Sequence, residues 1–175
     1  MRRSLLLAAV AALAVGCAGP WAGRAPDAGR ASAMRAEPFH LLDQVDRGTP
    51  SWRASMHLVA EGLRAEAEGR PAEAVERYDR ALQVEPSNPY AFLAIARYLA
   101  EHGRPDTALG HLEQAEALLA SRGTPPGLRA HLRGLRGFVL RELGDRERGA
   151  RLLEEARHGA PEVWADGFLD AEELL

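Results

Sequence analysis

The chain has 175 residues, of which 46% are hydrophobic and 27% are charged, and its formal net charge is −3. This length suits one domain of ordinary size, and the composition is that of a globular protein and not of a disordered or fibrous one. The slight negative charge argues against nucleic acid as a partner, because affinity for the phosphate backbone depends on clustered positive charge.

The first residues predict an export signal. Two arginines precede an apolar run from Leu5 to Val15, and small residues then lead to Cys17. Eleven apolar residues form a helix about 16 Å long, roughly half of a bilayer core of about 30 Å. A run of that length after basic residues is typical of a signal peptide and not of a membrane anchor. We therefore expect residues 1–16 to be a lipoprotein signal peptide that is removed on export.

Cys17 is the only cysteine of the chain, and it stands where the signal ends. The stretch LAVGC resembles the lipobox of bacterial lipoproteins, with Gly16 as the small residue before the cut and Ala14 where leucine is usual. The resemblance implies a diacylglycerol on Cys17, and several acyl chains hold a protein firmly on a membrane where a single one holds it only marginally. Because Ala18 and not aspartate follows, it also implies the outer membrane, with the protein facing the periplasm.

Residues 17–49 are predicted to form the lipidated cysteine and a flexible tether. Their first half is rich in Ala, Gly, Pro and Arg and shows no apolar period. In their second half, Phe39, Leu42 and Val45 recur at intervals of three, which predicts a short amphipathic helix over residues 38–46.

An apolar triplet recurs along the rest of the chain. Its copies are Ala74-Tyr78-Ala81, Ala108-Leu112-Ala115 and Gly149-Leu153-Ala156. The first two copies are 34 residues apart and the last two are 41 apart, which corresponds to 34 plus an insertion of seven. The insertion is GTPPGLR, whose adjacent prolines cannot continue a helix.

A second helix is predicted before each triplet, and a glycine separates the two. These glycines are Gly69, Gly103 and Gly144. Glycine adopts the left-handed conformation that ends a helix, and proline suits the first position of the next helix. The preceding helices are predicted over about residues 50–68, 89–102 and 127–143. The unit is therefore a helical hairpin.

This pattern resembles the tetratricopeptide repeat (TPR) family, whose unit is 34 residues in two antiparallel helices. The residues that carry the resemblance are Leu58, Gly62, Ala65, Ala74, Tyr78, Ala81 and Pro86, then Phe92, Ala96, Leu99, Ala108, Leu112 and Ala115, then Gly137, Leu140, Gly149, Leu153, Ala156 and Pro161. The implied fold is all-α, an α-solenoid of about three TPR hairpins over residues 50–161, in units of about 55–88, 89–122 and 130–161. Glu61, Arg133 and Arg136 depart from the family pattern.

The ends of such an array need covering, because each hairpin buries its apolar face against a neighbour. Residues 162–175 offer Trp164, Phe168 and Leu169, together with five acidic residues and no basic one. They predict a C-terminal capping segment with an acidic outer surface. The alternative is a tail that docks a partner.

No pattern of catalytic, metal-binding or cofactor-binding residues stands out. The six histidines are scattered without the helical spacing that places two ligands on one face, and no phosphate-binding loop or nucleophile elbow is present. We therefore expect no enzyme, no metal and no cofactor. The alternative is a periplasmic hydrolase or an enzyme-accessory subunit that uses a carboxylate or a histidine of the concave face.

The family resemblance implies that the first helix of each unit lines a concave groove. Its ligand-facing residues would be Met56, Val59, Leu63, Tyr90, Leu93, Arg97, His131, Phe138 and Arg141. This apolar strip would bind a peptide segment of an envelope protein, with Arg97 and Arg141 selecting acidic features. Alternatively, these side chains belong to the core or are covered by the Phe39 segment or the C-terminal tail.

The favoured hypothesis is a non-enzymatic adaptor that is lipid-tethered through Cys17 and scaffolds a cell-envelope assembly, such as one for pili, secretion or outer-membrane biogenesis. A further alternative is self-association through the exposed ends of the array.

Overall fold

The computed structural model describes residues 39–175, which contain helices and no strand. The elements are η1 (Leu41–Arg47), α2 (Pro50–Ala67), α3 (Pro71–Val84), α4 (Pro89–Glu101), α5 (Pro105–Arg122), α6 (Leu128–Glu142), α7 (Arg146–Gly159) and α8 (Ala171–Leu174). The predicted signal peptide and Cys17 lie outside the described residues. Within residues 39–175, no helix has both the length and the apolar character that crossing a membrane requires.

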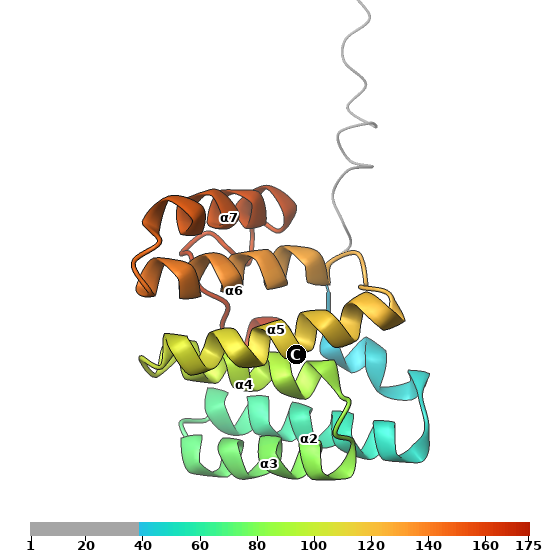
Figure 1. Cartoon of the computed structure of the whole chain (residues 1–175). Helices are drawn as coiled ribbons and strands as arrows, with labels where there is room; N and C mark the ends of the chain where they lie inside the picture. The colour runs from blue at the N-terminus through green and yellow to red at the C-terminus, as the bar shows by residue number, and fades with distance from the viewer. Residues whose placement is uncertain (1–38) are drawn as a thin grey trace, which may run out of the picture.

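The six long helices form three hairpins, α2 with α3, α4 with α5, and α6 with α7, which are stacked one on the next (Figure 1). The two helices of a hairpin approach closely where a glycine of one helix lies against the other helix. At Gly62 an added Cβ would lie 2.3 Å from the ring of Tyr78, and at Gly137 it would lie 2.9 Å from the backbone of Gly149. The predicted all-α solenoid is confirmed.

Glycines in the left-handed conformation separate the two helices of each hairpin. Gly69, Gly103 and Gly144 have φ values of 73°, 69° and 94°. Glycine adopts this region without the steric cost that a Cβ imposes. Pro71 and Pro105 then stand at the start of the next helix, where the missing N–H is not needed.

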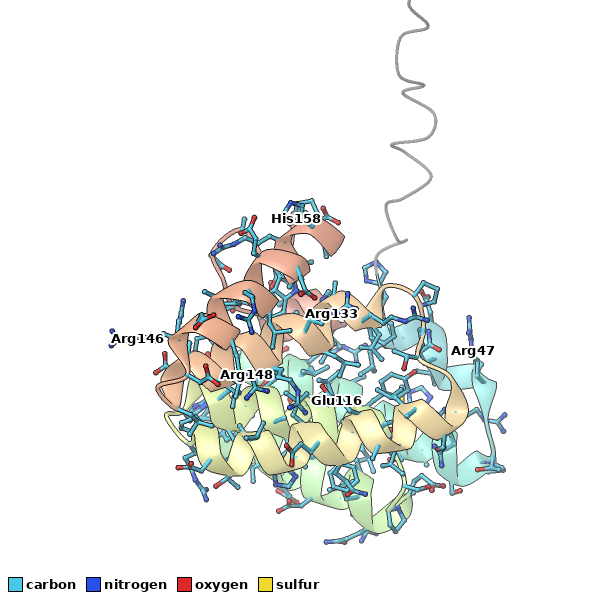
Figure 2. All side chains as sticks on the ribbon, turned by 45° about the horizontal axis from the view of Figure 1, so that its top comes forward. Arg47, Glu116, Arg133, Arg146, Arg148 and His158 are labelled. Atoms are coloured by element: carbon cyan, nitrogen blue, oxygen red, sulfur yellow. The ribbon has the colours of Figure 1, made fainter. Side chains whose placement is uncertain are left out.

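Arg133 and Arg136 depart from the family pattern, yet α6 is continuous through both residues. The Nη2 atom of Arg136 lies 2.6 Å from Glu116 on α5, and the Nε atom of Arg133 lies 3.4 Å from Glu155 on α7. Both guanidinium groups therefore lie at the outer edges of helix contacts, where water screens them. Figure 2 shows Arg133 and Glu116 toward the same side of the molecule.

The last helix of the array, α7, presents a polar outer surface. The buried residues of α7 are Gly149, Leu153 and Ala156, and Arg146, Arg148 and His158 project from its exposed side (Figure 2). The chain after α7 instead passes back along α6 toward α4 and α2 (Figure 1). A charged outer helix needs no cover, whereas the apolar side of the first helices does.

The segment before α2 also differs from the prediction. An amphipathic helix with Phe39, Leu42 and Val45 on one face was expected over residues 38–46, but the structure forms the 3-10 helix η1. Leu41 is fully buried and Leu42 is 43% exposed. A 3-10 helix has three residues per turn, so Leu41 and Gln44 share the face that packs on α2.

Two glycine substitutions test the close packing of the hairpins. Alanine in place of glycine favours a helix by about 1 kcal/mol when the site is open. Gly110→Ala has open space around the new Cβ, so we expect the free energy of unfolding to rise by about 0.5–1 kcal/mol. Gly137→Ala meets the backbone of α7, and we expect a loss of about 1–3 kcal/mol. Urea denaturation of both variants measures these changes, and a stabilising Gly137→Ala would contradict the packing described above.

Candidate functional site

The inner face of the array is the side of α2, α4 and α6 against which the end of the chain packs, and it includes the predicted groove. The structure places seven of the nine predicted groove residues in the interior, with Phe138 half-buried and Arg141 exposed. The seven are Met56, Val59, Leu63, Tyr90, Leu93, Arg97 and His131. The strip is therefore not open to solvent. Two segments of the chain itself cover it, η1 with Phe39 on one side and residues 160–175, the C-terminal segment, on the other.

Trp164 anchors the C-terminal segment to α6. Its side chain has no exposed surface, and a Cβ added at Gly134 would lie 2.3 Å from the indole ring. The indole Nε1–H donates to Nδ1 of His131 at 3.3 Å. The two glycines of the sequence RGLRG thus have separate roles, since Gly134 makes room for Trp164 and Gly137 allows the approach of α7.

The rest of the C-terminal segment crosses the inner face toward α2. Phe168 packs edge-on against Phe138 with ring centroids 4.8 Å apart. The carbonyl oxygen of Leu169 accepts a hydrogen bond from Nη1 of Arg97 at 3.5 Å. Leu169 and Leu174 are both fully buried. Apolar side chains therefore fix the segment at intervals, while Glu162, Asp166, Asp170 and Glu172 are exposed.

Aromatic rings join the two covering segments at α4 and α6. Phe39 stacks on Tyr90 with ring centroids 5.7 Å apart, and it lies edge-on to His131 at 6.1 Å. The other neighbour of His131 is Trp164, with ring centroids 6.5 Å apart. The backbone N–H of Leu42 also donates to the carbonyl oxygen of Leu175 at 3.4 Å. The beginning and the end of the described chain thus meet over the inner face.

His131 is neutral in this setting. Burial lowers the pKa of its imidazole from 6.5 to about 4, and His40 acts in the same direction while Glu162 opposes it. A neutral ring keeps the lone pair on Nδ1 that accepts the indole N–H of Trp164. Protonation of His131 would therefore break this hydrogen bond and place a charge in the interior.

A buried ion pair joins α2 to α4 beneath the C-terminal segment. The guanidinium group of Arg97 is 1% exposed and pairs with Glu66, and its Nη1 atom lies 3.0 Å from Glu101. The hydroxyl of Tyr78 donates to Glu66 at 3.0 Å. Burial raises the pKa of the Glu66 carboxyl, although Arg97 and Tyr78 act to lower it. The charge that was predicted to select acidic features of a partner is thus already balanced by carboxylates of this chain.

An open pocket of about 590 Å³ lies at one edge of the inner face, and we call it the edge pocket. It is formed by η1, the beginnings of α2 and α4, and the loop between α5 and α6. The lining residues are Gln44, Arg47, Gly48, Thr49, Trp52, Glu85, Pro89, Tyr90, Arg122, Gly123, Thr124, Pro125 and Pro126. Of these, only Tyr90 was singled out from the sequence as a binding residue. In the sequence, the proline-containing insertion after α5 is the feature that could have indicated this pocket.

A second opening of about 530 Å³ lies at the opposite ends of α2 and α4, between Glu66, Arg97 and Asp170.

Within residues 39–175, no cluster of three or more His, Cys, Asp or Glu side chains is arranged to hold a metal ion.

Comparison with known proteins gives one family match. Residues 65–123 match the family model described as tetratricopeptide repeat, and these residues cover the end of α2, all of α3, α4 and α5, and Gly123. No curated protein and no solved structure shows a significant match to the chain.

The neutral state of His131 predicts a pH-dependent stability. The pKa of His131 is about 4 in the folded chain and about 6.5 in the unfolded chain. The contribution of neutral His131 to the free energy of unfolding is therefore complete above pH 6.5 and is lost as the pH falls toward 4. His131→Gln retains an acceptor for Trp164 but does not titrate. We expect the wild type to lose about 3 kcal/mol more unfolding free energy than this variant between pH 7 and pH 4. Urea denaturation across this range measures the difference, and parallel curves for the two proteins would refute the prediction.

Proposed function

We propose that this chain is a tetratricopeptide repeat protein, as the family match of residues 65–123 supports, and that it is a non-enzymatic adaptor which holds a segment of a partner protein on its inner face. We further propose that a lipid on Cys17 tethers it to the bacterial outer membrane, facing the periplasm, where it scaffolds an envelope assembly. Stacked helical hairpins present extended surfaces of the kind that other proteins bind.

One observation supports the adaptor role above all. The inner face already holds a non-repeat segment, residues 160–175, through a few buried side chains and a hydrogen bond to its backbone. Trp164 packs at Gly134 of α6, the Leu169 carbonyl accepts a hydrogen bond from Arg97 of α4, and α8, which contains Leu174, packs on α2. Peptide recognition by a helical array works through such spaced apolar anchors. A partner segment with similar anchors would occupy the same positions.

A partner must then compete with the C-terminal segment. A covalently linked segment is present at an effective concentration of the order of millimolar, so a partner in dilute solution binds less tightly than its contacts alone would allow. Confining adaptor and partner to the same membrane raises their local concentration and offsets this effect. The proposed lipid tether and the covered inner face therefore fit together in one mechanism.

The tether is supported by the sequence alone. Two arginines and an apolar run precede LAVGC, which contains the only cysteine of the chain. We expect wild-type protein to stay with membranes through a high-salt wash, because acyl chains are held by burial and not by charge. Cys17→Ser lacks the attachment atom and should appear in the soluble periplasmic fraction. Finding this variant still bound after the wash would contradict the lipid tether.

The adaptor role is tested by site-specific photo-crosslinking in cells. A photoreactive residue at Phe138 lies beside Phe168 of the C-terminal segment, and one at Arg148 lies on the outer surface of α7 as a matched control. We expect position 138 to capture a defined envelope protein and position 148 to capture none. The crosslinking yield at position 138 should rise when Trp164→Ala weakens the binding of the C-terminal segment to the inner face. Equal capture from both positions, or none from position 138 in either background, would contradict the proposal.

A further inference from the structure

We propose that the edge pocket binds a carboxylate of the partner protein, carried by a glutamate or aspartate that stands next to an apolar residue. The inference rests on the adaptor role and adds the chemistry of the partner segment. It concerns a surface that stays open while the C-terminal segment covers a neighbouring part of the inner face.

The edge pocket is built largely from parts that lie outside the repeats. Gln44 and Arg47 come from η1, and residues 123–126 come from the insertion between α5 and α6. Its volume of about 590 Å³ falls within the usual range for ligand pockets, about 300–1,000 Å³. The pocket is therefore a feature of this chain and does not follow from the repeat pattern.

The charges around the pocket favour a singly charged anion. Two guanidinium groups, of Arg47 and Arg122, and one carboxylate, of Glu85, line it, and two positive charges minus one negative leave a net charge of +1. Arg47 has no carboxylate within 4.0 Å among residues 39–175, and Figure 2 shows it at the edge of the molecule. A carboxylate neutralises this net charge, whereas a doubly charged phosphate would leave an excess of one negative charge in the pocket beside Glu85.

Glu85 and Arg122 are held in place by neighbouring hydroxyl groups. Ser87 donates to Glu85 at 2.6 Å and Ser51 donates to it at 3.2 Å, and these hydrogen bonds lower the pKa of the Glu85 carboxyl. Arg122 donates to Ser87 at 2.8 Å, and its Cζ atom lies 5.2 Å from the ring centroid of Trp52. The guanidinium of Arg122 is therefore oriented before any ligand arrives.

Tyr90 supplies a hydrogen-bond donor that has no partner within the described part of the chain. Its side chain is only 4% exposed, and its ring is fixed between Phe39 and Trp52. Burial raises the pKa of its hydroxyl to about 12, while Arg47 and Arg122, which line the same pocket, act to lower it. A neutral hydroxyl beside two guanidinium groups is a suitable donor to a carboxylate.

The apolar walls of the pocket indicate which kind of residue stands next to the acidic residue in the partner. Trp52, Pro89, Pro125 and Pro126 present apolar surface next to the charged groups. Burying an apolar side chain there adds roughly 25 cal/mol per Å² of covered surface. A bare anion would leave these walls in contact with water, so an acidic residue beside an apolar one suits the pocket better.

Peptide binding tests this inference. The full-length chain, purified in detergent, is applied to an array of acetylated and amidated hexapeptides in which a central glutamate is flanked by every pair of apolar residues. Matched arrays carry glutamine or phosphoserine at the centre. The best glutamate peptide, followed by fluorescence anisotropy, should bind about tenfold more tightly than its glutamine counterpart. No preference for glutamate over glutamine, or a preference for phosphoserine, would overturn the proposal.

Four variants identify the site of binding. Tyr90→Phe removes only the hydroxyl and Arg47→Gln removes one charge, and each should weaken the glutamate peptide by about five- to tenfold. Tyr98→Phe on the same helix and Arg53→Gln on α2 make the same chemical changes away from the pocket and should leave binding unchanged. Thermal melting followed by circular dichroism checks that all four fold. Equal effects of the pocket and control variants would overturn the assignment.

Failure of the edge pocket proposal can be distinguished from failure of the adaptor role. If position 138 captures an envelope protein in cells but the peptide array shows no glutamate preference, the adaptor role stands and the edge pocket proposal is wrong. If position 138 captures nothing while Tyr90→Phe and Arg47→Gln weaken the glutamate peptide, the pocket binds carboxylates and the adaptor role is wrong.

Discussion

The apolar inner face of α2, α4 and α6 is the constraint on which the rest of the structure depends. A stack of three hairpins cannot bury this face with helices alone, and leaving it in water would forfeit the main favourable contribution to folding. Burial of one large apolar side chain contributes about 1.5–3 kcal/mol. The chain covers the face with Phe39 and η1 from one side and with Trp164, Leu169 and Leu174 from the other.

The covering of the inner face links the stability of the fold to the proposed adaptor role. In the proposed adaptor role, the side chains that hold the C-terminal segment in place fill the positions that a partner would use, so a partner could bind there only when this segment is released. The neutral His131, which accepts the hydrogen bond from Trp164, makes the contact sensitive to acid. The edge pocket lies beyond the segment and remains accessible in the covered state.

Glycine serves the same steric purpose in two different settings. Gly62 accommodates Tyr78 within the first hairpin, and Gly134 accommodates Trp164 of the C-terminal segment. The first pair is readable from the sequence because both members recur with the repeat. The second is not, because Gly134 and Trp164 are 30 residues apart and belong to no repeated pattern.

The sequence by itself determined the helices, their breaks and their pairing, because these follow from local signals: apolar residues three and four apart, glycines that end helices and prolines that begin them. Only the tertiary structure decided what covers the inner face and where an opening remains. The decisive contacts, from Trp164 to His131 and from Arg97 to Leu169, join residues 33 and 72 positions apart. Such contacts have no period, and they depend on the shape and charge of surfaces that exist only once the hairpins have stacked.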